Sequence, residues 1–232
     1  MQQAISRKRA GLWVVATIVG PLFFYWFASG WYIGVWYART GHQGAPTGEV
    51  MIEAMFIGLP PALWGAVALW WWINRKKADF GTLFLTRSRT LGADIAIGIG
   101  MGALWIAVYG LMDVVSWSEM FTLDRGKLLS IPASVSAGFC EEFLYRGFLF
   151  FVLAAAGAGK GWRLAISSVA FGLAHCFWGP WGMAWTAILG LTLGLAVLWR
   201  ASVWPAVIAH TLLDLCIEPA LIEKALAGGF RT

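Results

Sequence analysis

The chain has 232 residues, of which 59% are hydrophobic types and only 12% are charged. Soluble domains carry about 25% charged residues, so this chain has too few charges to cover the surface of a water-soluble fold. The net charge of +5 comes mostly from basic residues in short stretches between apolar runs, which argues against nucleic acid as a partner. The composition predicts a protein that membrane lipids surround.

Seven apolar segments are candidates to cross a bilayer, which takes about 20 apolar residues in a helix. They are Leu12–Tyr37, Val50–Ile73, Leu91–Val115, Ile131–Ala156, Trp162–Phe177, Gly182–Trp199 and Val203–Ile217. Residues Trp117–Leu129 and Glu218–Thr232 are expected to be interfacial segments, either of which could add an eighth. The sequence predicts an all-α, polytopic transmembrane helix bundle of seven to eight membrane helices, forming one integral membrane domain over residues 1–232.

The basic residues between these spans divide unequally. With the N-terminus in the cytoplasm, eleven of them fall on the cytoplasmic side, and five fall on the opposite side: Arg39, Arg125, Lys127, Lys224 and Arg231. Because basic loops stay in the cytoplasm, this bias predicts a cytoplasmic N-terminus. We expect an integral protein of the plasma membrane.

Two pairs of glycines stand at the GxxxG spacing, Gly98 with Gly102 and Gly190 with Gly194. Small residues four apart let helix backbones approach closely. We expect these pairs to pack helices within one bundle.

Charged residues inside a span cost at least about 2.5–3.5 kcal/mol each, so they persist where they are paired or used. The fourth span contains Glu141-Glu142-Phe143-Leu144-Tyr145-Arg146. Glu142 and Arg146 are four apart and share a helix face, which predicts an ion pair. Glu141 points about 100° away and needs a partner on another helix, where a buried carboxylate could act as a general base or acid.

Two further spans carry histidines. The fifth contains Phe171-Gly172-Leu173-Ala174-His175, and the seventh contains His210-Thr211-Leu212-Leu213-Asp214. His210 and Asp214 are four apart, so the carboxylate could orient the imidazole, or both could face one ligand. Each motif taken alone could be a satisfied structural group. Together they place Glu141, His175, His210 and Asp214 on three helices and predict a shared polar cavity.

The chain has 3 cysteines, an odd number with no close pair, which argues against a disulfide framework. Cys140 and Cys176 each neighbour a motif residue in sequence and therefore point about 100° away from it. We do not expect them to share a site with Glu141 and His175.

The ordered set EExxxR, FxxxH and HxxxD resembles the CAAX protease and bacteriocin-processing family, also called the Abi family. The resemblance covers about Ile131 to Asp214, and residues 131–217 are expected to form the catalytic core. It implies an intramembrane endopeptidase on a bundle of about eight helices. Glu141 and His175 would activate a water molecule, while His210 and Asp214 would stabilise the oxyanion, supported by Glu142 and Arg146.

One position departs from the family pattern. Asp214 stands where many members have Asn, and a carboxylate donates no hydrogen bond unless it is protonated. Asp214 could instead orient His210, leaving His210 as the main donor.

The family is also discussed as metal-dependent. If zinc were required, Glu141, His175 and His210 would be its ligands, since two His and one Glu make a catalytic zinc site. The compact HExxH motif is absent from the sequence, and we favour a mechanism without a cofactor.

Two other classes of protein use similar residues. A transporter or proton relay also needs intramembrane Glu, His and Asp, but the internal repeat typical of transporters is not evident in the sequence. A catalytically inactive scaffold would be expected to lose some motif residues, and all remain. The predicted partners are membrane lipids and a peptide or protein substrate, either lipidated or membrane-embedded.

Overall fold

The computed structural model describes residues 7–42, 46–48, 50–54, 56–58, 60, 63, 81 and 84–226. Its described residues form helices and no strand. The helices are α1 (Arg7–Thr40), α4 (Leu91–Leu111), α5 (Trp117–Phe121), α6 (Arg125–Glu142), η1 (Phe143–Phe148), α7 (Leu149–Ala155), α8 (Lys160–Ala174), η2 (Cys176–Trp178), α9 (Gly179–Arg200) and α10 (Trp204–Leu226). The predicted all-α class is confirmed.

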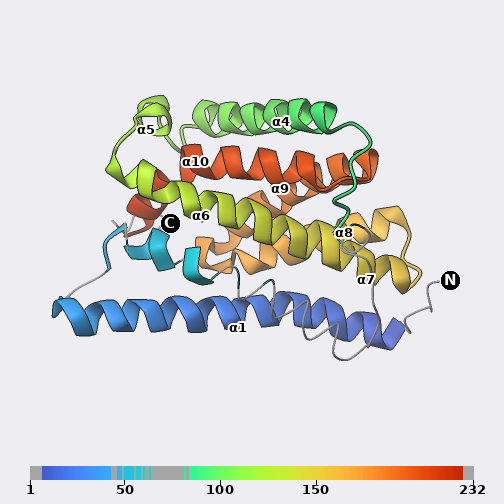
Figure 1. Ribbon diagram of the computed structural model, residues 1–232, viewed down its shortest axis with the longest axis horizontal. Coiled ribbons are helices and arrows are strands. Elements are labelled where there is room, and N and C mark those ends of the chain that lie inside the picture. Colours follow the sequence, from blue (N-terminus) through green and yellow to red (C-terminus); the bar gives the residue numbers. More distant parts are fainter. Residues whose placement is uncertain are drawn as a thin grey trace.

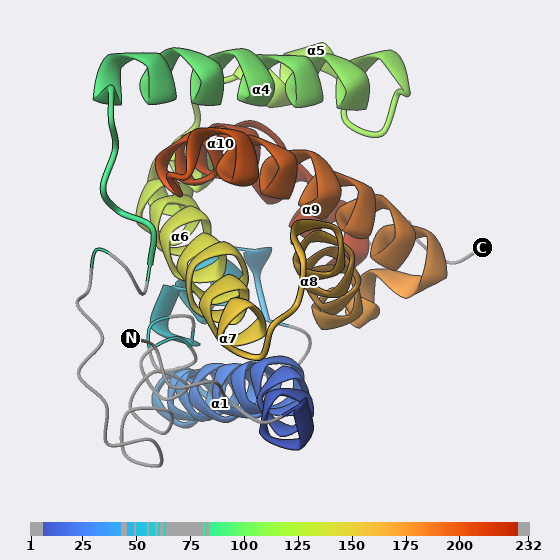
Figure 2. The same cartoon turned by 90° about the vertical axis from the view of Figure 1, so that its right-hand side faces the viewer.

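The long helices lie side by side, with α4 and α1 on opposite sides of the others (Figure 1, Figure 2). α10 packs against α4 on one side and against α6 and α9 on another. α8 packs against α9, and α1 contacts α7 and α8. The three helices that carry the polar motifs, α6, α8 and α10, are thereby enclosed between α4 and α1.

Glycines bring these helices close together. A Cβ atom at Gly98 would lie 2.7 Å from the Cβ of Ile208, and one at Gly102 would lie 3.1 Å from the Cβ of Leu212, both on α10. At Gly194 it would meet Leu164 Cδ1 at 2.6 Å. The expectation that the GxxxG pairs pack helices within one chain is confirmed.

Within the described residues, three helices are long and apolar enough to cross a membrane, namely Leu91–Leu111, Gly179–Arg200 and Trp204–Ile222. They correspond to the third, sixth and seventh predicted spans, and the chain is an integral membrane protein. The predicted span Val50–Ile73 lies largely outside the described residues. The count of seven to eight membrane helices stays a prediction.

The structure differs from the prediction where helices end. The predicted fifth span, Trp162–Phe177, stops as an α-helix at Ala174, because His175 leaves helical geometry with φ −98 and ψ 26. The predicted seventh span, Val203–Ile217, continues to Leu226 through Pro219. Proline removes only one backbone donor, and packing of α10 against α4 and α6 holds the helix together.

α5 is a short helix on the rim of the bundle, in the segment predicted to be interfacial. Its N-terminus is stabilised by a capping box between Ser116 and Glu119. The exposed rings of Trp117 and Phe121 stack with centroids 6.2 Å apart. Such amphipathic rings favour the headgroup level of a membrane.

Candidate active site

The site is built around a buried ion pair. Arg146 Nη1 donates to Glu142 Oε1 at 2.7 Å, and both side chains have 0% exposure. Glu142 ends the α-helical part of α6, and Arg146 lies in the π-helical η1 segment that follows it. Single π turns within helices often occur at functional sites, where they redirect side chains. The predicted Glu142–Arg146 pair is confirmed.

His210 joins this pair from α10. Its Nδ1 lies 2.9 Å from Glu142 Oε1, the oxygen that also accepts from Arg146. Because a carboxylate only accepts, Nδ1 carries the proton in this hydrogen bond. The other ring nitrogen, Nε2, lies 3.4 Å from Asp214 Oδ2. Two carboxyl groups therefore hold the imidazole of His210 from both sides.

His175 faces Glu141 across the interface of α8 and α6. His175 Nδ1 lies 2.8 Å from the carbonyl oxygen of Phe171, which can only accept, so this nitrogen is the donor. In the neutral ring Nε2 is then an acceptor, and it lies 3.8 Å from Glu141 Oε2. That separation is too long for a hydrogen bond and suits one small molecule between the two atoms.

The position of His175 follows from the break at the end of α8. That helix has 15 residues, about 22 Å at 1.5 Å per residue, less than the thickness of a bilayer core. The chain then turns through η2 and starts α9 at Gly179, whose φ of 75 favours glycine. The turn holds His175 within the bundle instead of at its far end.

Phe171 is the packing centre of the site. Its ring centroid lies 4.3 Å from Arg146 Cζ, 4.6 Å from the His175 ring and 5.6 Å from the His210 ring. The guanidinium thus gains a cation–π contact in addition to its ion pair. Gly190 on α9 leaves room for this arrangement, because a Cβ there would lie 2.8 Å from Arg146 Nη2. The sequence motif contained Phe171, but nothing in the sequence predicted this contact.

The structure brings all four predicted catalytic residues into one region. Glu141 interacts electrostatically with His175, His210 and Asp214. The side chains of Glu141 and His175 are each 17% exposed and that of Asp214 is 14% exposed, whereas Glu142 and Arg146 are fully enclosed. The partly exposed groups can reach a ligand, and the enclosed pair can only position them.

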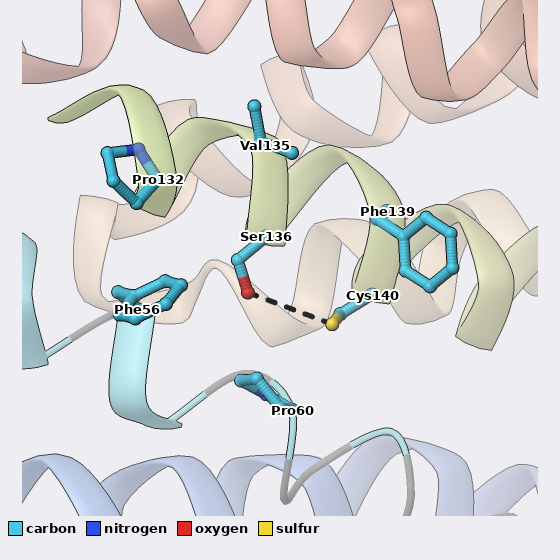
Figure 3. Close-up of a pocket in the computed structure, with 7 residues that line it drawn as sticks. All are labelled: Phe56, Pro60, Pro132, Val135, Ser136, Phe139 and Cys140. Carbon is cyan, nitrogen blue, oxygen red and sulfur yellow. Dashed lines mark hydrogen bonds between the residues drawn. The ribbon is translucent and has the colours of Figure 1, made fainter.

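An apolar pocket lies beside this region on another face of α6. Its cavity volume is about 490 Å³, and Figure 3 shows its lining: Phe56, Pro60, Pro132, Val135, Ser136, Phe139 and Cys140. None of the predicted catalytic residues lines it. Cys140 and Cys176 are free thiols, Cys140 in this pocket and Cys176 on the surface.

The described residues do not fit a zinc site. No group of three or more His, Cys, Asp or Glu side chains within the described part of the chain is arranged to hold a metal ion. Both ring nitrogens of His210 face carboxyl oxygens of Glu142 and Asp214. Glu141, His175 and His210 therefore do not present three free ligand atoms to a common point.

The sequence reasoning missed one acidic residue. Glu218 on α10 is buried and interacts electrostatically with Asp214, Glu141 and His210. The sequence could have revealed this residue, because Glu218 follows Asp214 by four residues, just as Asp214 follows His210. The expected end of the span at Ile217 had placed it outside the bundle.

Comparison with known proteins supports the interpretation of this region. Residues 126–216 match the family model of Rce1-like proteins, described as type II CAAX prenyl endopeptidase Rce1-like. The match covers less than half of the chain and includes all four predicted catalytic residues. No curated protein and no solved structure matches the chain. The resemblance to the CAAX protease family is confirmed for this segment.

Proposed function

We propose that this chain is an intramembrane endopeptidase that hydrolyses peptide bonds with a water molecule held between Glu141 and His175. The observation that carries the proposal is the pair of atoms His175 Nε2 and Glu141 Oε2, 3.8 Å apart on two helices. The match of residues 126–216 to CAAX prenyl endopeptidases agrees with it.

A water molecule between these atoms has acceptors for both of its protons. It would lie about 2.8 Å from each, an ordinary hydrogen-bond length. Glu141 takes one proton as the water oxygen attacks the carbonyl carbon of the substrate, which is general base catalysis. The proton passes to the leaving nitrogen when the C–N bond breaks, so one water molecule is consumed for each peptide bond.

The oxyanion that forms during attack needs hydrogen-bond donors. We assign this role to the Nε2–H of His210 as an imidazolium, whose Nδ1–H is held by Glu142 at 2.9 Å and whose Nε2 lies beside Asp214. Arg146 fixes Glu142 in turn, from the fully buried side of the site. Glu142 and Arg146 are thus positioning residues.

We favour a mechanism that uses no metal. It is supported by the engagement of both His210 nitrogens, each of which lies beside a carboxyl oxygen. Holding zinc would require at least one of these contacts to be given up and His210 to turn toward Glu141 and His175.

The test is cleavage of a membrane-tethered peptide reporter by the purified protein in detergent, with and without a chelator. We expect Glu141→Ala and His175→Ala each to abolish cleavage. Cys140→Ser is the matched control, because Cys140 adjoins Glu141 in sequence but lines a different pocket. Cleavage that a chelator stops and zinc restores would overturn the metal-free mechanism.

Substrates in two forms would test the lipid preference. We propose a peptide or protein substrate with a lipidated tail, following the description of the matching family. A prenylated reporter should then be cleaved faster than the same peptide without its prenyl group. Proton or ion flux through liposomes containing the wild type, with no cleavage of either reporter, would contradict the peptidase function and favour a transporter.

A further inference from the structure

A stripe of three residues on α8 faces the segment that carries Glu141. Ser167, Phe171 and His175 are successive steps of four residues, so they lie along one side of the helix and of the residue that follows it. Ser167 Oγ donates to the carbonyl oxygen of Tyr145 at 2.9 Å, and the ring centroids of Phe171 and Tyr145 lie 5.3 Å apart. His175 Nε2 lies 3.8 Å from Glu141 Oε2. The two segments therefore run antiparallel and meet along the whole stripe.

The Ser167 hydrogen bond joins two helices in a buried place. Ser167 is 1% exposed, and its bond to Tyr145 in η1 links residues 22 apart. The next residue, Ser168, is 5% exposed, but its Oγ donates at 2.8 Å to the carbonyl oxygen of Leu164 in the same helix. Two adjacent buried serines thus differ in what they hold. The Ser167 bond ties α8 to η1, whereas the Ser168 bond stays within α8.

The contact of α8 with α9 is of another kind. A Cβ at Gly172 would lie 2.5 Å from the carbonyl oxygen of Met183, and one at Gly194 would lie 2.6 Å from Leu164 Cδ1. These close approaches make α8 and α9 a packed pair. Apolar contact is non-directional, whereas a hydrogen bond restricts both a distance and an angle. The Ser167 bond therefore fixes where along η1 this pair of helices lies.

The position of α8 along η1 decides where His175 lies. His175 follows Ser167 by eight residues, about 12 Å along a helix. A shift of α8 at Ser167 is carried over this short distance to the imidazole. The 3.8 Å between His175 Nε2 and Glu141 Oε2 suits one small molecule. Misplacing a catalytic group by about 1 Å can slow a reaction about 100-fold.

We propose that Ser167 is a positioning residue of the active site, whose hydrogen bond to the Tyr145 carbonyl oxygen sets the separation of His175 from Glu141. This inference rests on the proposed peptidase function for its effect on cleavage. The place of the His175 ring does not depend on cleavage, so the two claims can be tested separately.

The first experiment is nitrogen NMR of the purified protein in detergent, with isotope-labelled histidine. The chain has 3 histidines, so the spectrum is simple, and His175→Ala identifies the signals of that ring. Ser167→Ala should shift the His175 Nε2 signal toward its value in Glu141→Ala, because the ring moves away from the carboxylate. Ser168→Ala is the matched control and should leave the signal unchanged. A His175 signal in Ser167→Ala identical to that of the wild type overturns the proposal, whatever the activity.

The second experiment is steady-state cleavage of the peptide reporter. Ser167→Ala should lower kcat about 10- to 100-fold and leave KM nearly unchanged, because it misplaces groups that act in the chemical step. Ser168→Ala should keep both constants of the wild type. Ser167→Cys fills a similar space with a much weaker donor, so it preserves the packing of α8 and should show the same loss of kcat and the same NMR shift.

A purely structural role for Ser167 gives a different result. It predicts a lower thermal unfolding temperature in detergent, with the kcat of the folded protein and the His175 signal at their wild-type values, and that outcome overturns the proposal. If Ser167→Ala does not fold, Ser167→Cys decides the question, because a wild-type His175 signal in this variant also overturns the proposal. Failure of the wild type to cleave would count against the proposed function alone, because the NMR result is independent of it.

Discussion

At the scale of single residues, one buried guanidinium links the three polar sequence motifs. Arg146 donates to Glu142, and the same Glu142 oxygen accepts from His210. The face of the Arg146 guanidinium packs on the ring of Phe171, and the Phe171 carbonyl oxygen orients His175. Arg146 is fully buried, and Nε and Nη2 have no hydrogen-bond partner in the described part of the chain. The stability of the site therefore depends strongly on the Glu142–Arg146 pair.

Replacing Arg146 with Met should destabilise the protein by about 3–5 kcal/mol, because it leaves the Glu142 carboxylate buried without a cation. The double variant Glu142→Leu/Arg146→Met should recover much of this loss and remain inactive, since His210 then loses its anchor. The measurement is equilibrium unfolding in denaturing detergent followed by circular dichroism. If Arg146→Met alone were as stable as the wild type, the Glu142–Arg146 pair would not be required for the structure.

At the scale of helices, α6 and α10 approach so closely that only glycine fits at one contact. A Cβ atom at Gly138 would lie 2.2 Å from Thr211 Oγ1 and 2.9 Å from the Thr211 backbone nitrogen. Asp214 and Glu141 lie on either side of this contact, on the helices that it joins. The spacing of these helices sets the geometry of the proposed catalytic groups.

Gly138→Ala should therefore cost about 1–3 kcal/mol of stability and reduce cleavage, because the two helices must move apart. Thr211→Ala removes the clashing Oγ1 atom, so in the Gly138→Ala background it should restore part of the lost stability and part of the lost cleavage. Gly100→Ala on α4 is the matched control: nothing lies within 4 Å of its Cβ position, and alanine favours helix by about 0.8–1.0 kcal/mol. Thermal unfolding and reporter cleavage would be compared, and equal effects at both glycines would refute the close-contact explanation.

α5 has a pH-dependent cap. The Ser116 hydroxyl, followed by the Ser116 backbone N–H, donates to Glu119 and lowers the pKa of its carboxyl group, with a smaller effect from Lys224. Because the pKa of Glu119 is lower in the folded protein than in the unfolded chain, its ionised carboxylate stabilises α5. This stabilisation is complete above the unfolded pKa of about 4.3 and is lost as pH falls through the folded pKa.

Amide hydrogen exchange in α5 should accelerate as pH falls below about 4, beyond the intrinsic pH dependence of exchange. Glu119→Gln keeps a side-chain acceptor but has no charge to titrate, so its α5 protection should be lower at neutral pH and change less on acidification. Identical pH profiles for the two proteins would contradict the role of the cap.

At the scale of the whole molecule, the orientation in the membrane stays a prediction, and the helix ends show where some of the basic residues lie. α1 begins at the right-hand end of Figure 1 and α10 ends at the left-hand end. α8 begins at Lys160 and α9 ends at Arg200, two of the basic residues assigned to the side of the N-terminus. Near the opposite end, Lys127 donates to the carbonyl oxygen of Glu119 in α5, and Lys224 donates to the carbonyl oxygen of Val114, which precedes α5.

A topology reporter fused to the N-terminus should therefore give a cytoplasmic signal, and one fused to the C-terminus should give the opposite signal. A reporter inserted in residues 157–159, between α7 and α8, should agree with the N-terminal fusion. Matching signals from the two terminal fusions would contradict an odd number of spans, and an N-terminal signal from outside the cytoplasm would contradict the orientation.

The sequence by itself determined the class of the protein and its local pairs. Low charge predicts a membrane protein, and the i,i+4 spacings of Glu142 with Arg146 and of His210 with Asp214 follow from helix geometry alone. Glu218 was within reach of the same rule, but the seventh span was expected to end at Ile217, whereas α10 continues through Pro219 and packs against α4 and α6.

Only the tertiary structure decided which motifs meet. The bond from His210 to Glu142 joins residues 68 apart, and the contact of Arg146 with Phe171 crosses from η1 to α8. Local spacing places a side chain on a helix face, but the faces that meet depend on how closely the helices approach, which is set here by glycines. The separation of Glu141 from His175 is likewise set by where α8 breaks and by how it packs.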